Sequence, residues 1–366
     1  REKLEEHLQG VRLRIIKDSS KASEATKVRD PNYLKKVFDQ QTPIGQKLEY
    51  FLATGNLRSG SGLDLQQKSG YTIVAERLNN MRYFNHFHSI HRGSFFTEMK
   101  TTTVRKLLPE SWGFICPVHT PDGGPCGLLN HIAVNCKMLT EPSLKSNHKK
   151  LSEICASLGM SPNNEISCIF PSNYIVVCED GVVIGYIDPE KAEEFVKSLR
   201  YLKVSQIEGK LIPVDLEIAY IPPSPFGKST QFPGIFLATR EARFVRPVKY
   251  LASNQTDWIG PLEQLYLSIA CVEEDIRNDT THQEFDPADI LSVLAQQIPF
   301  LDNNQSPRNM YQCQMAKQTM GTPYHNFPYR FDNKVYRLIN PQLPLVKCKN
   351  FEDYAFGDYP SGTNAI

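Results

Sequence analysis

The amino-acid sequence predicts a multidomain protein of the α+β class. Its 366 residues exceed what one hydrophobic core normally organises, and this length indicates two to four domains. Apolar residues recur at helical spacing over about the first 55 residues, whereas short β-branched runs bounded by turns fill much of the middle. A segment rich in proline and glycine, 109–127, separates the two regions. Helices and strands are therefore expected in different parts of the chain.

Three helices are predicted before Gly55. In the first, apolar side chains recur every three or four positions, as one packed helical face requires. They are Leu4, Leu8, Val11 and Ile15. A second helix should begin at Asp30-Pro31, and a third should begin near Pro43 and end at Gly55.

The following segments are predicted from their glycines, prolines and aromatic residues. Residues 58–70 include Ser-Gly-Ser-Gly and favour a loop, residues 71–87 should return to helix, and residues 88–93 should form a second loop. Residues 109–127 hold too many prolines and glycines for a long helix or a central strand. We expect a compact loop there, followed by a buried strand at 132–134.

The middle of the chain predicts strands with covering helices. Two β-branched runs flank Glu179-Asp180-Gly181, which indicates a β-hairpin over 174–187. Residues 189–202 predict an amphipathic helix, and its inward face should hold Ala192, Phe195, Val196 and Leu199. Further helices are expected at 146–158 and 288–297, and further strands at 217–220, 235–239 and 243–251.

A short helix after residue 305 has signals at both ends and two distinct faces. Ser306 is a favourable N-cap, Pro307 suits the first turn, and Gly321 should adopt the left-handed conformation that ends a helix. At roughly 100° per residue, one face gathers Arg308, Tyr311, Gln312, Met315, Gln318 and Thr319. The face expected to pack holds Met310, Cys313, Lys317 and Met320. An arginine on a polar face can fork onto phosphate oxygens, or it can cap the carbonyl groups of a neighbouring segment beside a half-buried tyrosine.

Composition and charge exclude several classes of protein. No apolar run approaches the roughly 20 residues of a membrane span, and the first residues lack a signal-peptide pattern. The nine cysteines include no Cys-x-x-Cys pair, so neither a zinc finger nor a disulfide framework is expected. The net charge is only +1, but residues 82–106 and 305–350 are basic and would form a phosphate track if they shared one surface. Because the first residue is not methionine, we interpret the chain as a fragment of a longer protein.

Four segments are similar to one protein family. Residues 304–321 read Asn-Gln-Ser-Pro-Arg-Asn-Met-Tyr-Gln-Cys-Gln-Met-Ala-Lys-Gln-Thr-Met-Gly, and residues 112–130 contain Trp-Gly, Cys-Pro, Thr-Pro-Asp-Gly and Gly-Leu. Ala-Thr-Gly-Asn at 53–56 and Gly-Thr-Asn-Ala-Ile at 362–366 agree with them. These motifs resemble the second-largest, β-like subunit of multisubunit DNA-dependent RNA polymerases. Over residues 105–130 the sequence is most similar to RNA polymerase I, the eukaryotic enzyme that makes ribosomal RNA.

The resemblance implies how the chain is divided and what it does. Five parts are expected: the C-terminal part of the protrusion at 1–80, the fork at 81–150, two external domains at 151–230 and 231–285, and the start of the hybrid-binding domain at 286–366. The implied activity is template-directed nucleotidyl transfer by a DNA-directed RNA polymerase in the nucleus and nucleolus. The implied partners are the largest subunit, other polymerase subunits, DNA template, RNA transcript and nucleoside triphosphates, and no membrane.

The resemblance also gives roles to individual residues. Arg308 is expected to contact the triphosphate. Nucleic-acid contacts are expected from Gln305, Tyr311, Lys317, Gln318, His91, Arg92 and Arg105. Asp122, where the family often has glutamate, should brace loops around the active centre together with Arg105. His282 and Glu284 match a Thr-His-x-Glu motif and are expected to form a local hydrogen-bonded pair with a structural role.

The metal chemistry is expected to come from another chain. Nucleotidyl transfer needs divalent metal ions held by clustered carboxylates, and no Asp-x-Asp-x-Asp cluster occurs here. In the family that this chain resembles, the catalytic Mg²⁺ is held mainly by residues of the largest subunit. We therefore expect that this chain alone binds no metal and is inactive.

Other interpretations remain open beside this one. The chain alone could act only as an assembly scaffold that docks other subunits through the hairpin at 173–187. The glycine-rich loop at 120–127 lacks the spacing of nucleotide-binding motifs, but it leaves a stand-alone nucleotide enzyme as an alternative. A nucleophilic pair of Cys116 and His119 lacks a third, orienting residue. A metal site lacks acidic or thiol partners near its candidate ligands His86, His88 and His91.

Overall fold

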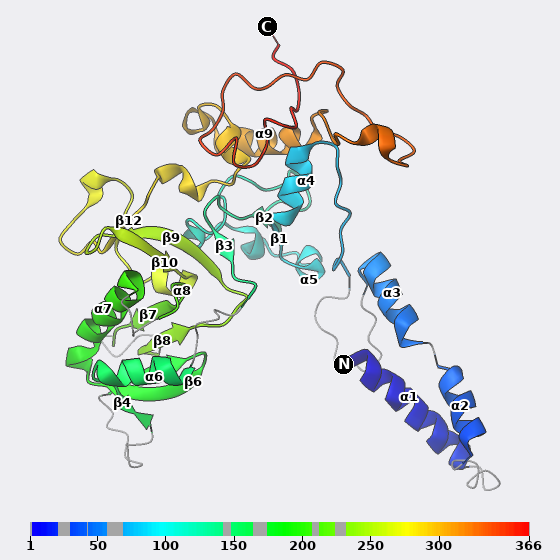
Figure 1. Cartoon of the computed structure of the whole chain (residues 1–366), viewed down its shortest axis with the longest axis horizontal. Coiled ribbons are helices and arrows are strands. Elements are labelled where there is room, and N and C mark those ends of the chain that lie inside the picture. Colours follow the sequence, from blue (N-terminus) through cyan, green and yellow to red (C-terminus); the bar gives the residue numbers. More distant parts are fainter. Residues whose placement is uncertain are drawn as a thin grey trace. The chain divides into compact units, whose positions relative to one another are not determined.

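The computed structural model describes residues 2–20, 30–41, 43–56, 69–141, 148–163, 174–206, 212–223 and 232–365. They fall into two compact units, both drawn in Figure 1. The first comprises Arg1–Arg77 and His91–Arg105, and the second comprises Leu78–Ile90 and Lys106–Ile366. In the described residues, no helix is both long and apolar enough to cross a membrane. Helices and mixed sheets occupy different stretches of the chain, which confirms the α+β class.

The first unit is helical, as its periodicity predicts. Its elements are α1 (Glu2–Ser19), α2 (Pro31–Asp39), α3 (Ile44–Thr54), α5 (Ser94–Thr97) and η2 (Thr103–Arg105). Asp30 caps α2 by accepting a 2.9 Å hydrogen bond from the N–H of Asn32, and Gly55 ends α3 with a φ of 68°. The loop predicted at 58–70 lies, but for its last two residues, outside the described residues.

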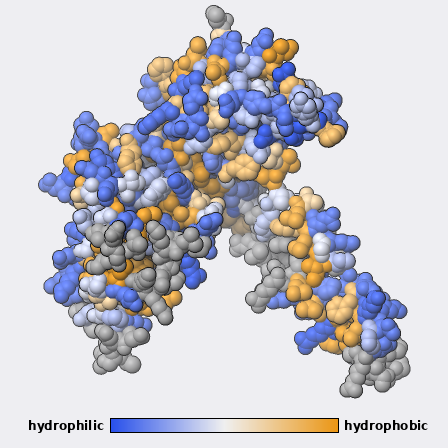
Figure 2. Space-filling model, viewed as in Figure 1, coloured by the Kyte–Doolittle hydropathy of each residue, from blue (hydrophilic) through white to orange (hydrophobic). Residues whose placement is uncertain are grey.

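Apolar side chains also remain on the surface of this unit. Leu4 and Leu8 are each 49% exposed and Leu52 is 69% exposed, and Figure 2 shows residues of this kind in orange along the helices. Helices α1 and α2 are joined by a 2.9 Å hydrogen bond from the hydroxyl of Tyr33 to Asp18. Helical periodicity here therefore marks apolar faces that the described part of the unit only partly buries.

The second unit begins with α4 (Asn80–Phe87) and a two-stranded sheet of β1 (Ser89–His91) and β2 (Leu129–His131), of which the last residue of β1 is counted with the first unit. The prediction of helix over 71–87 is wrong for its first half. The side chain of Asn79 accepts a 2.7 Å hydrogen bond from the N–H of Arg82, so the helix starts at that cap. The loop predicted at 88–93 contains β1, and the strand predicted at 132–134 lies at β2 instead.

Residues 109–127 form the compact loop that their prolines and glycines predict. Apart from the short 3-10 helix η3 (Pro109–Ser111), they contain turns and irregular backbone. Thr120 closes the loop, because its hydroxyl donates to the carbonyl of Leu129 at 2.8 Å and accepts from the N–H of Gly127 at 2.9 Å. A side chain thus replaces the hydrogen bonds that a strand or helix would supply.

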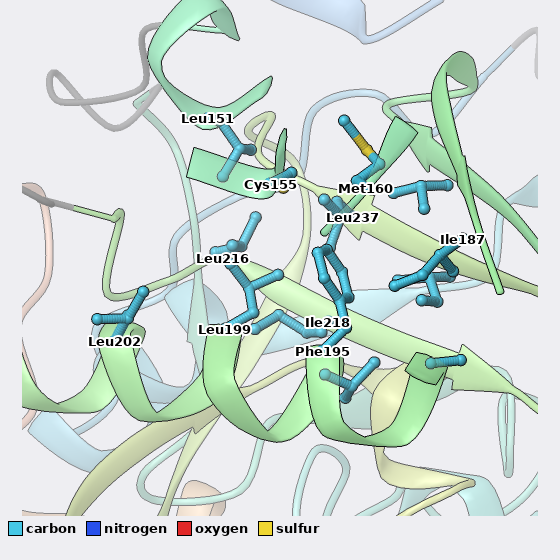
Figure 3. Close-up of a cluster of buried hydrophobic side chains, with 14 of the residues drawn as sticks. Leu151, Cys155, Met160, Ile187, Phe195, Leu199, Leu202, Leu216, Ile218 and Leu237 are labelled. Carbon is cyan, nitrogen blue, oxygen red and sulfur yellow. The ribbon is translucent and has the colours of Figure 1, made fainter. Parts of the chain in front are cut away.

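The largest core lies between helices and a five-stranded sheet of order β4-β6-β5-β8-β7. The elements are α6 (His148–Ser157), β4 (Ser161–Pro162), β5 (Ile175–Glu179), β6 (Val182–Ile187), α7 (Pro189–Ser205), β7 (Glu217–Ile221) and β8 (Gly234–Ala238). The predicted hairpin is β5–β6, and its turn places Asp180 and Gly181 at φ of 47° and 84°. The predicted inward face of α7 is buried. Figure 3 shows side chains of this core, among them Leu151, Cys155, Phe195, Leu199, Ile218 and Leu237.

A second sheet follows, of order β10-β9-β12-β11, with β3 also paired to β9. Its elements and connections are β3 (Lys137–Met138), β9 (Phe244–Tyr250), β10 (Gln255–Ile259), α8 (Pro261–Gln264), β11 (Ile269–Ala270), η5 (Glu273–Asp275) and β12 (His282–Gln283). Strand β9 confirms the prediction for 243–251, whereas β10 to β12 were not predicted.

Charged side chains are buried where α7 meets this sheet. Asp257 of β10 accepts a hydrogen bond from Arg200 at 2.8 Å, forms an ion pair with Lys203 at 2.7 Å, and lies 3.3 Å from Nε2 of His282. Arg200 also contacts Glu263. Burial alone would raise the pKa of Asp257, but Lys203, the hydrogen bond from His282 and Arg200 hold it below its ordinary value. The buried charges therefore compensate one another.

The prediction that His282 and Glu284 pair with each other is wrong. His282 faces Asp257, while Glu284 accepts from Arg246 at 2.7 Å. Side chains two positions apart point to the same side only within a regular strand. Strand β12 ends at Gln283, so Glu284 lies outside it and need not share a side with His282. Both side chains are nevertheless buried, in agreement with a structural role.

The C-terminal part consists of short helices: η6 (Pro287–Ile290), η7 (Ala295–Gln297), η8 (Leu301–Asn303), α9 (Ser306–Gln318) and η9 (Phe327–Tyr329). The continuous helix predicted at 288–297 is wrong. Leu291 is extended between η6 and η7, and its carbonyl accepts a 2.9 Å hydrogen bond from the N–H of Val134. A tertiary hydrogen bond therefore replaces the helical one at this position.

Candidate functional site

The candidate site is the exposed face of α9. Arg308, Gln312 and Gln318 are exposed and Tyr311 is half-buried, so the polar face faces solvent as its spacing predicts. The guanidinium carbon of Arg308 lies 5.8 Å from the centroid of the Tyr311 ring. Within the described residues, the side chain of Arg308 makes no hydrogen bond or ion pair, so the alternative in which it caps a neighbouring segment is not observed.

The start of α9 differs from the prediction in one respect. Gln305, not Ser306, is the N-cap residue, and no side chain caps the helix. The carbonyl of Gln305 accepts from the N–H of Arg308 at 2.9 Å, so the backbone of Arg308 is fixed in the first turn. Pro307 also lies in the first turn, where its missing N–H has no helical partner to lose. Gln305 itself is exposed at this end of the helix.

The opposite face of α9 is buried and holds the helix in place. Cys313 is 1% exposed and packs with Cys116, Leu294 and Ala295. Asn309, which was not predicted as a packing residue, donates from its amide to the carbonyl of Leu301 at 2.9 Å. Of the predicted packing residues Cys313 and Lys317 are buried, whereas Met320 is 46% exposed.

Asn79 secures the far end of α9, and no sequence signal pointed to it. Its side chain is fully buried and donates to the carbonyls of Ala316 at 2.8 Å and Thr319 at 2.7 Å. The prediction that Gly321 ends the helix in a left-handed conformation is wrong. Glycine is required there for another reason: a Cβ atom would lie 2.7 Å from Oγ of Ser361.

Lys317 lies under α9 rather than on its exposed face. It is 7% exposed, and its Nζ lies 3.2 Å from Nε2 of His131. Because Nδ1 of His131 lies 3.1 Å from the carbonyl oxygen of His119, Nδ1 is the donor and Nε2 accepts from the ammonium. The rings of His119 and His131 stack with 3.5 Å between centroids, and Nδ1 of His119 lies 2.7 Å from Oγ of Ser292.

Burial sets the protonation of this group. It lowers the pKa of Lys317 to about 8. Burial, reinforced by the nearby Lys317 ammonium, lowers the pKa of His131 to about 3, and burial lowers the pKa of His119 well below its ordinary value. At neutral pH the lysine is therefore charged and both imidazoles are neutral. The nucleic-acid contact assigned to Lys317 stays a prediction, since its ammonium is directed at His131.

The remaining predicted residues lie elsewhere. Asp122 is exposed in the 109–127 loop, and its bracing role stays a prediction. His91, Arg92 and Arg105 belong to the first unit, and their nucleic-acid contacts stay predictions. His91 is exposed, and its Nδ1 accepts from the N–H of Gly93 at 2.8 Å.

Two alternative chemistries find no support in the geometry. Cys116 is buried in the apolar cluster with Cys313, while His119 bonds to Ser292, so the two do not form a nucleophilic pair. In the part of the chain that the structure describes, no group of three His, Cys, Asp or Glu side chains is placed to hold a metal ion.

Three family models match separate parts of the chain. They are described as RNA polymerase Rpb2, domain 3, over residues 73–138; RNA polymerase I, Rpa2 specific domain, over residues 184–246; and RNA polymerase Rpb2, domain 6, over residues 294–366. The last of these includes α9. The polymerase I model covers the β6–α7 region, which contributes to the largest core.

Whole-chain similarity points to the same family. DNA-directed RNA polymerase I subunit RPA2 of Euplotoides octocarinatus is 54% identical over 325 residues, 88% of this chain and 28% of that protein. Subunit RPA135 of Saccharomyces cerevisiae is 48% identical over 370 residues, 100% of this chain and 30% of that protein. RPA2 of Homo sapiens is 44% identical over 367 residues, 100% of this chain and 32% of that protein. The chain thus spans about 30% of the length of these relatives. It belongs to the family of second-largest subunits of DNA-directed RNA polymerases, and the relatives that it matches here are those of RNA polymerase I.

Proposed function

We propose that this chain contributes triphosphate and DNA–RNA hybrid contacts to template-directed RNA synthesis by RNA polymerase I. One observation carries the proposal. Arg308, which has no hydrogen-bond or ion-pair partner among the described residues, stands on the exposed face of a helix whose buried face is fixed at both ends. A guanidinium in this setting is free to form paired, charge-assisted bonds with phosphate oxygens. The three relatives compared above are RNA polymerase I subunits, which favours this function over a scaffold alone.

Arg308 acts by position and charge in this proposal. Its guanidinium holds the triphosphate in line for attack by the RNA 3′-hydroxyl and offsets negative charge that develops on the leaving pyrophosphate. Tyr311 and Gln318 share its face and lie along the RNA end of the hybrid, with Gln305 at the start of the helix. Contacts of this kind position nucleic acid without reading its sequence.

The partners and the metal are part of the same proposal. Mg²⁺ held mainly by the largest subunit would supply the Lewis-acid chemistry of nucleotidyl transfer. This chain supplies side chains that bind and orient the substrate. The proposed partners are the largest subunit, the other polymerase subunits, DNA, RNA and nucleoside triphosphates, and the proposed location is the nucleus, in the nucleolus.

The test replaces Arg308 in the whole polymerase. We expect Arg308→Ala to raise the apparent nucleotide KM and to slow single-nucleotide addition by about 10-fold or more, the cost of one charge-assisted contact of roughly 1.5–3 kcal/mol. Arg308→Lys should recover part of this loss, because it restores charge but not the fork. Arg240→Ala, which removes an arginine whose side chain is 73% exposed in another part of the chain, is the matched control. Unchanged addition kinetics in Arg308→Ala would remove the proposed role.

A further inference from the structure

We propose that the buried contact between Lys317 and His131 positions Arg308, by fixing the rotation of α9 about its own axis. The inference rests on the proposed function, because it assigns a means of support to the same arginine. Lys317 is then a positioning residue that acts from beneath the helix and does not touch the substrate.

The geometry places the two side chains on opposite sides of the helix. Nine positions separate Arg308 from Lys317, and at roughly 100° per residue this is a rotation of about 180° from one to the other. Arg308 is exposed, whereas Lys317 is 7% exposed. Any turn of α9 that displaces the lysine therefore swings the guanidinium by the same angle.

The other anchors of α9 restrain its ends. Asn309 binds the carbonyl of Leu301 at the start, and Asn79 binds the carbonyls of Ala316 and Thr319 at the end. At its N-terminal end α9 is held through one of its own side chains, and at its C-terminal end it is held through its backbone carbonyls. Lys317 adds a side-chain bond in the last turn, on the face that points into the protein.

The contact is directional and its partner is held rigidly. His131 is the last residue of β2, donates to the carbonyl of His119 and stacks on the His119 ring, while His119 contacts Ser292 in the segment before η7. Three separate segments of the chain therefore fix the position of His131 Nε2, the atom that accepts the hydrogen bond from the Lys317 ammonium. An apolar side chain at 317 would pack against Cys313 and its neighbours but would not define a rotation in this way, because apolar contacts are not directional.

A buried ammonium is costly, so its presence requires a reason. Within the described residues Lys317 has no carboxylate partner. Its ammonium meets the neutral imidazole of His131, and the nearby Cys313 and Cys116 favour its charge while Arg82 opposes it. A methionine would fill similar volume without that cost. Retention of a polar group that does not favour stability is accounted for by the geometry that it fixes.

A small rotation of α9 moves the Arg308 side chain by a distance that matters for substrate binding. Side-chain atoms lie about 5–6 Å from a helix axis, so a rotation of about 20° moves them by roughly 2 Å. A displacement of about 1 Å can cost on the order of 100-fold in rate when a group must meet a reacting centre. Loss of the Lys317 contact should therefore impair the same step that Arg308→Ala impairs.

The experiment is a double-mutant cycle in the whole polymerase. Lys317→Met and His131→Leu remove the contact from either side, and His131→Gln restores an acceptor near the position of Nε2. We expect each of the first two variants to raise the apparent nucleotide KM by about 10-fold or more, and His131→Gln to recover most of the loss. Combined with Arg308→Ala, Lys317→Met should add almost nothing, because its effect passes through the absent arginine.

Controls separate positioning from stability and from direct nucleic-acid contact. Ile218→Val removes one buried methyl group from the core beside the β4-β6-β5-β8-β7 sheet and so destabilises the fold modestly. It should leave the nucleotide KM unchanged. A direct contact of Lys317 with nucleic acid predicts a weaker salt dependence of hybrid binding in Lys317→Met and no loss in His131→Leu; that pattern overturns the inference. Full additivity with Arg308→Ala, or an unchanged KM in Lys317→Met, also overturns it. If Arg308→Ala leaves nucleotide addition unchanged, the proposed function is wrong, and this outcome differs from one in which only the Lys317 variants have no effect.

Discussion

Asn79 joins two helices, and its replacement gives the sharpest test of how α9 is held. Its Oδ1 accepts from the N–H of Arg82 at the start of α4, and its amide donates to Ala316 and Thr319 at the end of α9. Losing the N-cap costs about 0.5–2 kcal/mol, and leaving buried carbonyls without partners costs about 1–3 kcal/mol each. One cap and two carbonyls together predict a cost of roughly 2.5–8 kcal/mol for Asn79→Ala.

Asn79→Asp separates the two ends of this link. The aspartate keeps an oxygen for the N–H of Arg82, so α4 should retain its cap. It removes both donors to α9 and brings a negative charge to the carbonyl end of that helix, which the helix dipole disfavours. The alanine variant should loosen both helices, and the aspartate variant only α9.

Hydrogen exchange measured by mass spectrometry on the assembled polymerase reads each helix separately. A local loss of about 3 kcal/mol corresponds to roughly 100-fold faster exchange of the amides in the last turns of α9. Peptides from the hairpin β5–β6 serve as an internal reference, because that hairpin belongs to a different core. Unchanged exchange of α9 in both variants would show that Asn79 does not hold it and would refute the reasoning.

Three further predictions concern the folded core. Gly113 has a φ of 73°, and a Cβ atom there would lie 2.7 Å from the Arg246 side chain; Gly113→Ala should therefore lower the unfolding free energy by about 1–3 kcal/mol, measured by urea denaturation against Gly124→Ala, where a Cβ meets nothing within 4 Å. Asp257→Asn leaves the Arg200 and Lys203 charges under-compensated and should cost about 3–5 kcal/mol; an unchanged urea midpoint contradicts this. His131, with its pKa lowered to about 3, binds fewer protons folded than unfolded, so its contribution to stability is complete above pH about 6.5 and is lost as the pH falls toward 3. His131→Gln should flatten that part of the pH profile of unfolding, and an identical profile in both proteins rules the assignment out.

Sequence reasoning succeeded where structure follows from local pattern. Apolar spacing predicted α1 and α7, and the Asp180-Gly181 turn predicted the β5–β6 hairpin, because helical period and positive-φ turns depend on residues a few positions apart. The same spacing predicted that Arg308 lies on an exposed face of α9. The motifs in α9 and in the 109–127 loop were also sufficient for the family, which the comparisons then supported.

Sequence reasoning failed where a distant partner decided the outcome. The helix predicted at 288–297 is interrupted because the carbonyl of Leu291 bonds to Val134, and Gly321 is needed for close approach to Ser361 rather than for a helix end. In each case a local propensity worth a fraction of a kcal/mol was outweighed by a tertiary contact worth more.

By itself, then, the sequence determined which side of α9 faces solvent and which family the chain resembles, because helical spacing and short motifs depend only on residues that are close together in the chain. Only the tertiary structure decided what holds α9 in place. Asn79 meets Ala316 across 237 positions, and Lys317 meets His131 across 186. No periodicity links residues so far apart, because their contact depends on the path of all the chain between them.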